Sequence, residues 1–413
     1  MTRSRATRAL LTAGGLSFAA LWAWAGTVLW DTTVPGDLAL PDLAAADFFG
    51  ARALERARDY ERLAAILVAA GALAQVVVLG LYARGGGRFA RESAAGPIGT
   101  GMLLGMLGFA FVWFAQVPFG LTALWWARRH DLTEVGYPDW LLQDWLGVGG
   151  KFVFVCLALL VVMGLARLLG RRWWLAGGPA LAAIGLGFAF VAPYLIPDQE
   201  PLRDPALARD ARDLARRQGV PGVGVRVQAV KEETTAPNAA AVGLGATRRV
   251  ILWDTLADGF PRREVRAVLS HEFGHHSEDH LWKLFAWQAL LALPLALLIE
   301  RGTRRRGGLR EPGAVPLAIF LLVVLQLVTL PLQSALSRRY EAEADWAALQ
   351  TTRDPAAVQR LFARFTDRAL ADPSPPAWEQ FVFAGHPSLL DRIAMAEAWK
   401  RRTGVDTGPP PAP

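Results

Sequence analysis

The chain alternates long apolar runs with short polar segments. Seven runs approach or exceed the roughly 20 apolar residues that a helix needs to cross a bilayer. They cover residues 9–30, 63–83, 97–127, 152–169, 173–196, 283–299 and 314–336. The sixth run is short and contains Pro294, so a buried core helix is the alternative there. The pattern predicts a mainly α-helical, polytopic membrane protein with about seven transmembrane helices.

The first apolar run follows the basic segment MTRSRATR, an arrangement that secretory signals share. Cleavage after such a signal is the alternative to a retained helix. The run is long, and six later runs would hold the chain in the membrane in either case. We therefore interpret residues 9–30 as a true first transmembrane helix.

Composition and charge agree with a membrane protein. The 413 residues are 53% hydrophobic and 20% charged, with 16 tryptophans and a net charge of +7. The arginines flank alternate short loops instead of forming one patch, so we expect no nucleic-acid partner. By the positive-inside rule, the basic loops at 84–91, 167–172 and 301–310 face the cytoplasm, which places the polar module outside. The opposite orientation is the alternative, because long loops such as 198–281 are poor indicators of orientation. We expect a multi-pass protein of the cell membrane, in contact with the lipid bilayer.

The longest polar segment, residues 198–282, predicts a small α+β module. Asp204 before Pro205 is a helix N-cap signal, and Gly219 ends that helix. Alternating residues 223–230 and the apolar run 248–253 predict two strands. The expected organisation is a membrane region 1–197 with five helices, the module 198–282, two further membrane helices in 283–336, a second part of the module in 337–400, and a disordered proline-rich tail 401–413.

Four of the six histidines lie in HEFGHHSEDH, residues 271–280, which contains the motif HExxH. On a helix, His271 and His275 share one face and can bind one metal ion, while Glu272 borders the same site. Catalytic zinc takes three protein ligands and a water, and it lowers the pKa of that water to about 7. Glu272 is therefore the candidate general base. A polar helix end with incidental histidines is the alternative.

A third ligand is available in the segment YEAEAD, residues 340–345. Glu341 and Asp345 lie four residues apart, so Asp345 can accept the free ring N–H of a ligand histidine when Glu341 binds the metal. Glu343 competes for the ligand role but leaves the helix at a different angle. The residues alone leave both glutamates open, and a solvated charged helix end is the alternative to any ligand role.

These blocks together resemble the type I CAAX prenyl protease family of membrane zinc metalloproteases. HEFGHHSEDH resembles the family's zinc helix with a further histidine at His280, and YEAEAD resembles its ExxAD block. The segments 237–256 and 385–397 resemble its Asn-Ala segment and its His-Pro block, in the same order along the chain. The resemblance covers roughly residues 195–400. KEETTAP, which precedes Asn238, departs from the lead-in of the eukaryotic enzymes, so their substrate preference transfers less readily than their chemistry.

The resemblance implies a gluzincin-like module that binds one Zn²⁺ per chain through His271, His275 and Glu341, with Asp345 orienting a ligand. It further implies that Asn238 and Ala239 contact the substrate and that His386 faces the active site, where it could stabilise an oxyanion. We assign Arg392 to substrate binding too, with an acidic partner or a solvent-exposed position as alternatives.

The sequence thus predicts a membrane zinc endopeptidase that hydrolyses peptide bonds of membrane-associated, lipidated or misfolded proteins, with Glu272 moving the proton. Two other classes fit parts of the pattern. One is an inert zinc-binding regulatory protein, although a structural site needs no general base. The other is a metal or proton transporter, although the ionisable cluster lies outside the centres of the apolar runs.

Overall fold

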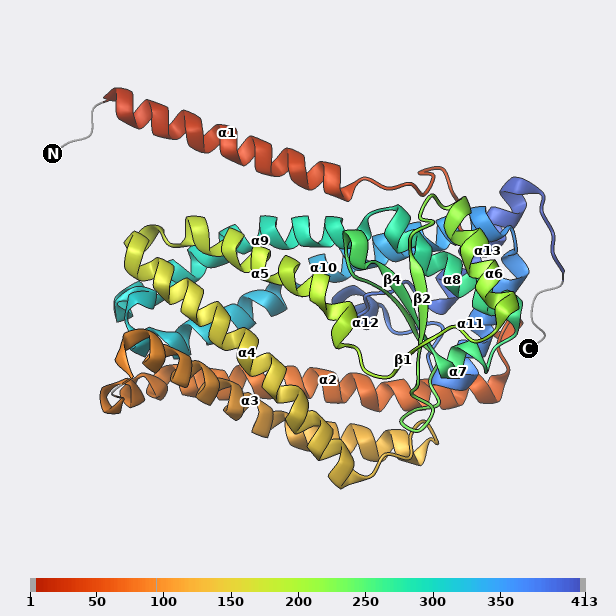
Figure 1. The fold of residues 1–413 in the computed structure, drawn as a ribbon, viewed down its shortest axis with the longest axis horizontal. Helices are drawn as coiled ribbons and strands as arrows, with labels where there is room; N and C mark the ends of the chain where they lie inside the picture. The colour runs from red at the N-terminus through yellow and green to blue at the C-terminus, as the bar shows by residue number, and fades with distance from the viewer. Residues whose placement is uncertain (1–4, 94, 409–413) are drawn as a thin grey trace.

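The computed structural model describes residues 5–93 and 95–408. It shows long helices side by side with a small sheet-containing module at one end (Figure 1). The helices are α1 (Arg5–Trp30), α2 (Ala51–Gly85), α3 (Gly96–Arg129), α4 (Tyr137–Leu169), α5 (Trp174–Leu195), α6 (Pro205–Arg217), α7 (Asp254–Ala257), α8 (Arg262–Ser277), α9 (His280–Thr303), α10 (Val315–Thr352), α11 (Pro355–Ala369), α12 (Ala377–Val382) and α13 (Leu389–Thr403).

Six of the described helices, α2, α3, α4, α5, α9 and α10, are long and apolar enough to cross a membrane. The first apolar run forms helix α1, whose described apolar stretch, Ala19–Trp30, is shorter. Figure 1 shows α1 set apart from the other helices along much of its length. The indole N–H of Trp22 donates to the carbonyl of Leu290 on α9 at 3.0 Å. The prediction of a mainly helical, multi-pass membrane protein is confirmed.

The basic loops gather at the end of the bundle opposite the module (Figure 1). Short 3₁₀ turns form these connections: η2 (Gly86–Glu92), η3 (Gly170–Arg172), η5 (Arg304–Arg306) and η6 (Gly308–Arg310). Because consecutive membrane helices run in opposite directions, alternate loops meet at one end. The arrangement agrees with the alternation of basic loops in the sequence.

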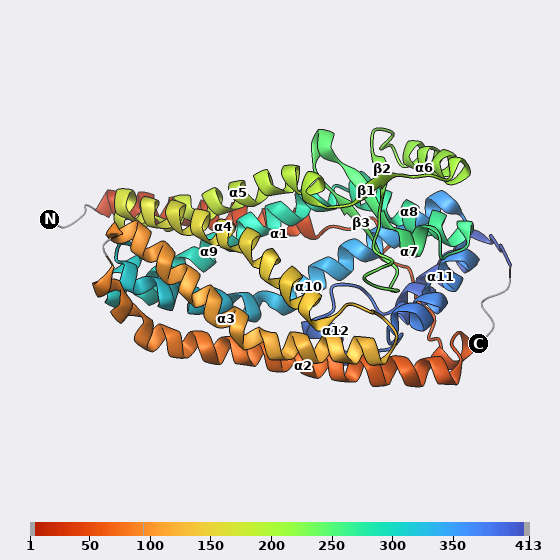
Figure 2. The same ribbon diagram turned by 60° about the horizontal axis from the view of Figure 1, so that its bottom comes forward.

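Helix α10 joins the membrane region to the module (Figure 2). Its 38 residues extend about 57 Å at 1.5 Å per residue. A bilayer core is about 30 Å thick, so roughly half of α10 projects beyond it. The N-terminal half is apolar, and the projecting C-terminal half carries the YEAEAD segment.

The module contains a four-stranded sheet in the order β1-β2-β4-β3. The strands are β1 (Gln199–Pro201), β2 (Gly224–Gln228), β3 (Ala239–Val242) and β4 (Arg249–Trp253). β2 and β4, the two predicted strands, pair in parallel, while β1 and β3 pair antiparallel at the two edges. The edge strands have three and four residues, too few for an alternating pattern to be visible in the sequence.

A continuous apolar core holds the module together. Leu252 of β4, Leu214 of α6 and Phe273 of α8 are fully buried in it, so one face of the sheet packs against both helices. The cap of α6 is as predicted: the side chain of Asp204 accepts the backbone N–H of Ala206 at 2.7 Å. Gly219 follows the helix with φ +74°, a conformation that favours glycine.

The metal-binding helix and the next membrane helix are separate elements. Helix α8 ends at Ser277, and α9 begins at His280. Asp279 between them has φ +56°, the left-handed conformation, which interrupts the helical path. Because of this break, α9 runs in a different direction from α8.

The C-terminal segment contacts the module. Helix α13 continues to Thr403. The hydroxyl of Thr407 donates to Asp354 at the start of α11 at 3.0 Å. Only residues 409–413 of the predicted tail 401–413 lie outside the described residues.

Candidate metal centre

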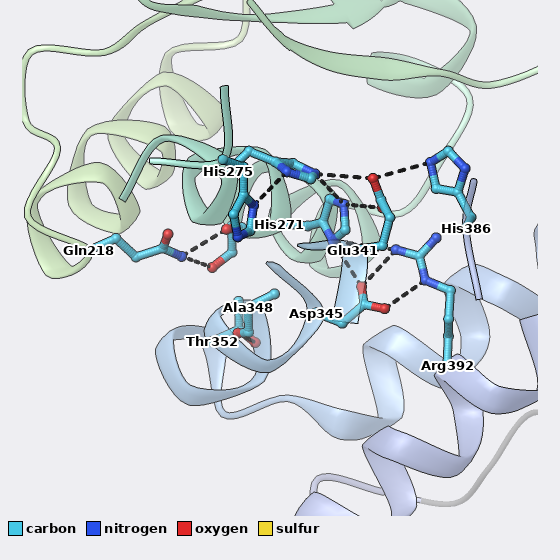
Figure 3. A network of polar contacts seen from close by, with 11 residues as sticks. Gln218, His271, His275, Glu341, Asp345, Ala348, Thr352, His386 and Arg392 are labelled. Atoms are coloured by element: carbon cyan, nitrogen blue, oxygen red, sulfur yellow. Dashed lines mark hydrogen bonds and ion pairs between the residues drawn. The ribbon is translucent and has the colours of Figure 1, made fainter. Parts of the chain in front are cut away.

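The metal centre forms where α8 crosses α10. Gly274 lies between the two histidines of HExxH, and a side chain there would meet the backbone of Ala344, with a Cβ only 3.1 Å from its Cα. The absence of that side chain lets the two helices approach closely. Residues of α8 and α10 that are some 70 positions apart in the sequence therefore share one site (Figure 3).

Three side chains converge with the spacing of a tetrahedral metal site. Nε2 of His271 lies 3.1 Å from Nε2 of His275 and 3.2 Å from Oε2 of Glu341, and Nε2 of His275 lies 3.5 Å from Oε1 of Glu341. Ligands bonded to zinc at about 2.0–2.1 Å in a tetrahedron lie about 3.3 Å from one another. Oε2 of Glu341 is buried without a hydrogen-bond partner. The three residues thus fit a bound metal ion.

One line of contacts orients His271. Its Nδ1 lies 2.8 Å from Oδ1 of Asp345, and Arg392 holds that carboxylate through two hydrogen bonds of 2.7 and 2.6 Å. Burial lowers the pKa of His271, but Asp345 and Glu341 outweigh it and raise this pKa to about 10. The site therefore stabilises positive charge on or beside the imidazole, as a metal ligand position requires.

A second line orients His275. Its Nδ1 lies 2.9 Å from Nδ1 of His280, whose Nε2 lies 3.0 Å from Oε2 of Glu343. Lys283 is 3.3 Å from the same carboxylate oxygen, and the ring of His280 stacks on Tyr340 at 4.7 Å. With the proton of His275 on Nδ1, each imidazole donates to the next acceptor, and Nε2 of His275 remains free for a metal.

The contacts of Glu343 separate its position from that of Glu341. Glu343 is fully buried and turned toward His280, away from the converging nitrogens of His271 and His275. The ring of His276 points elsewhere: its Nε2 lies 3.1 Å from the carbonyl oxygen of Arg249 on β4. Among the described residues, Glu341 is the carboxylate grouped with both HExxH histidines.

Glu272 is buried next to the three converging side chains. The residue is only 7% exposed. The pKa of Glu272 is raised to about 7, mainly by burial and also by the charge of Glu341. His271, Arg392 and the Ala241 backbone oppose this rise. A proton acceptor works best when its pKa is near the ambient pH. The surroundings of Glu272 thus bring its pKa close to neutral pH.

A cavity of about 90 Å³ joins these residues to the edge strand. Eight of the residues singled out from the sequence line its walls: Asn238, Ala239, His271, Glu272, Glu341, Asp345, His386 and Arg392. The remaining one, His275, lies beside this wall and contacts His271. The ring of His386 is 67% exposed, with Nε2 3.4 Å from Oε1 of Glu341. Arg392 is 9% exposed and held by Asp345, which favours the acidic-partner alternative over a solvent-exposed position.

Some residues around the cavity were not found in the sequence. Leu361, Phe362 and Phe365 of α11 form an apolar wall beside the polar groups. Their only signal is amphipathic spacing, which also describes an ordinary core helix. The link from His280 to Glu343 was missed as well, because it depends on the turn at Asp279.

Comparison with known proteins finds relatives of this chain. Residues 201–400 match peptidase family M48. The uncharacterized metalloprotease YhfN of Bacillus subtilis is 27% identical over 63% of this chain and 63% of its own length. CAAX prenyl protease 1 of Saccharomyces cerevisiae is 29% identical over 48% and 49% of the two chains. The chain is thus similar in sequence to membrane metalloproteases of the M48 and CAAX prenyl protease groups.

The fold of the chain agrees with a solved structure. The crystal structure of S. mikatae Ste24p superposes with a TM-score of 0.68 and covers 92% of this chain and 96% of that one, at 17% identity. The agreement includes the membrane helices as well as the module. The metal-binding arrangement therefore lies within a shared membrane architecture.

Proposed function

We propose that this metalloprotease is a zinc endopeptidase of the cell membrane that cleaves membrane-associated, lipidated or misfolded protein substrates. The spacing of the His271, His275 and Glu341 ligand atoms, with Glu272 beside them, is the observation that carries the proposal. Two imidazoles and one carboxylate are a typical ligand set of catalytic zinc, which keeps one position open.

In this proposal, each residue at the site has its own role in peptide-bond hydrolysis. Bound zinc would act as a Lewis acid on the scissile carbonyl and would lower the pKa of an adjacent water. Glu272 takes the proton of the attacking water and passes it to the departing amine. Asp345 and His280 hold the two ligand imidazoles in orientation. The exposed ring of His386, 3.4 Å from Glu341, would donate to the oxyanion.

The edge strand β3 is suited to hold an extended peptide. The backbone N–H of Trp253 on β4 donates to the carbonyl oxygen of Asn238 at 3.0 Å. Because hydrogen-bonding directions alternate along an antiparallel pair, the polar groups of Ala239 and Ala241 point away from β4. The N–H of Ala239 donates to Oδ1 of Asn238 at 2.9 Å, and the N–H of Ala241 donates to Glu272. A peptide that replaces these contacts would pair with the edge without a demand for a particular sequence.

The apolar wall of α11 adds a preference to this general binding. Phe362 and Phe365 line the cavity beside Glu272, so an apolar substrate side chain next to the scissile bond would be buried there. Burial of such a side chain is worth about 1.5–3 kcal/mol. We therefore expect apolar residues near the cleaved bond to be favoured.

The test compares wild-type protein with Glu272→Gln, purified in detergent. Both proteins should hold about one zinc ion, because Glu272 is not a ligand. Cleavage of an unstructured reporter peptide should fall by a factor of about 10² to 10⁴ in the variant, the usual contribution of a general base. Metal content and cleavage products, measured by mass spectrometry, check both expectations.

The outcomes separate the alternatives. Full zinc content without cleavage of any peptide by wild type would favour the inert regulatory protein. Metal flux in proteoliposomes that survives Glu272→Gln would favour a transporter. A wild-type protein that binds no zinc would refute the ligand assignment.

A further inference from the structure

A second cavity is lined by residues of the basic loops and adjacent helix ends. These loops lie at the end of the helix bundle opposite the module (Figures 1 and 2). The cavity has a volume of about 190 Å³, room for several molecules the size of water, each about 30 Å³. It lies between the end of α4, the turn η3, the end of α9 and the turn η6. Its charged lining residues are Arg171, Glu300, Arg304 and Arg310.

Glu300 forms the base of this cavity. It is 2% exposed, within a helix that is apolar enough to cross the membrane, and the indole N–H of Trp173 donates to its Oε2 at 2.8 Å. A carboxylate buried in such a helix is costly unless it is paired, and it commonly marks a functional position. Glu300 therefore needs cationic partners at the cavity mouth.

Arg171 and Arg304 supply that charge without using their hydrogen-bond donors. Their Nε atoms lie 3.9 and 3.6 Å from Oε1 of Glu300, close enough for attraction but too far for a hydrogen bond. Among residues 5–93 and 95–408, neither guanidinium donates a hydrogen bond. The carboxylate thus keeps both arginines near the cavity while their N–H groups stay available.

Arg310 makes the cavity electropositive. It is exposed and forms no ion pair with another described residue. Three guanidinium groups against one carboxylate leave a net charge of +2. Gly307 and Gly308, at φ +85° and +68°, turn the chain back over Glu300, where a Cβ on Gly308 would lie 3.5 Å from Oε2. Such a set of guanidinium groups suits a phosphate, which accepts paired N–H donors.

The surroundings favour a phosphate that carries acyl chains. α4, α5 and α9 all end beside the cavity, at the level where phospholipid headgroups lie. Next to it, Leu168 is 82% exposed and Leu175 is 51% exposed, so apolar surface faces the lipid. Basic pockets between membrane helices bind anionic headgroups in this way. We propose that this cavity binds the phosphate of an anionic glycerophospholipid.

The experiment measures lipid binding to the purified full-length protein. Phosphatidylglycerol, phosphatidylcholine or inorganic phosphate is added in detergent, and the bound fraction is followed by native mass spectrometry. The triple variant Arg171→Gln, Arg304→Gln and Arg310→Gln is compared with Arg88→Gln, Arg91→Gln and Arg305→Gln. The second set removes three exposed arginines at the same end that do not line the cavity.

Wild type should prefer phosphatidylglycerol to phosphatidylcholine. Since each arginine near an anionic lipid contributes about 1 kcal/mol, the cavity triple should bind phosphatidylglycerol at least about tenfold more weakly, and the control triple should bind like wild type. If the cavity triple does not fold, the single variant Arg310→Gln, which breaks no ion pair, should still lose about fivefold.

Other results would overturn the proposal. Equal losses in both triples would indicate diffuse surface charge. Equal affinity for the two lipids would show that the headgroup charge does not determine binding. Competition by inorganic phosphate as strong as by phosphatidylglycerol would indicate a site for free anions. None of these results depends on peptide cleavage, so they are independent of the proposed protease function.

Discussion

At the residue scale, each metal-binding histidine has a different support. His271 contacts Asp345, which Arg392 holds by two charge-assisted hydrogen bonds. His275 contacts His280, a second imidazole, which ends on the buried carboxylate of Glu343. A hydrogen bond to the second ring nitrogen fixes the tautomer and the orientation of a ligand histidine. Both supports should therefore contribute to metal affinity.

The role of His280 can be tested without disturbing the packing. His280→Phe keeps a ring on Tyr340 but removes the contacts to His275 and Glu343. Loss of such a support typically weakens metal binding by about 10- to 100-fold. Competition with a chromophoric chelator measures the zinc Kd. His276→Gln, a change on α8 outside this line, should retain the wild-type Kd. Equal Kd values for all three proteins would rule out the orienting role.

At the element scale, the break between α8 and α9 lets the site form. The left-handed residue Asp279 ends the path of α8, and His280 then returns toward His275 and stacks on Tyr340 of α10. In a continuous helix, residues 275 and 280 would lie five positions apart and on different faces. The turn is thus as necessary for the second line of contacts as the histidines themselves.

The conformation of Asp279 predicts how substitutions there affect stability. Asp279→Gly should leave the thermal unfolding midpoint unchanged or raise it, because glycine adopts φ +56° without cost. Asp279→Val should reduce the stability by about 1–2 kcal/mol, because a branched side chain disfavours this conformation. The neighbouring Glu278→Val, at φ −90°, is the control and should change the midpoint less. A larger loss in the control would mean that backbone strain does not govern this turn.

At the scale of the whole molecule, a metal ion would connect the two parts of the module. His271 and His275 belong to the extramembrane helix α8, whereas Glu341 lies on α10, which continues into the membrane. Ligands from both elements mean that metal binding also stabilises their crossing. The charge distribution is likewise a property of the whole chain, since the basic loops and the module occupy opposite ends.

Metal removal should therefore lower the stability of the protein. Free zinc at 100 times its Kd stabilises a folded protein by about 2.7 kcal/mol relative to the metal-free form. We expect chelation to lower the unfolding midpoint of wild type, and zinc to restore it. Glu341→Ala should respond much less. An undiminished response in this variant would show that zinc stabilises the protein from another position.

The orientation in the membrane follows from the basic loops. In a Cys156→Ser background, we place a single cysteine at Arg305, in the basic end, or at Glu232, in an exposed loop of the module. By the positive-inside rule, a membrane-impermeant maleimide should label Glu232→Cys on intact cells, and Arg305→Cys only after permeabilisation. The reverse labelling would place the metal centre on the cytoplasmic side.

The sequence by itself determined the class of the molecule and much of its chemistry. Apolar runs exclude water wherever they lie in the fold, so they predicted the membrane helices without tertiary information. The four-residue spacing of His271 and His275 also follows from helix geometry alone. The cap at Asp204 and the two central strands are similarly local, because each depends on residues that are close in the sequence.

The tertiary structure decided what depends on contacts between distant segments. The choice of Glu341 over Glu343 rests on how α10 is rotated against α8, which Gly274 permits through close approach. The short edge strand β3 exists because β4 pairs with it, and the cavity beside Glu300 exists because three helix ends meet. Local patterns record the preference of each segment, whereas these features arise from the free energy of packing segments together, which no single segment contains.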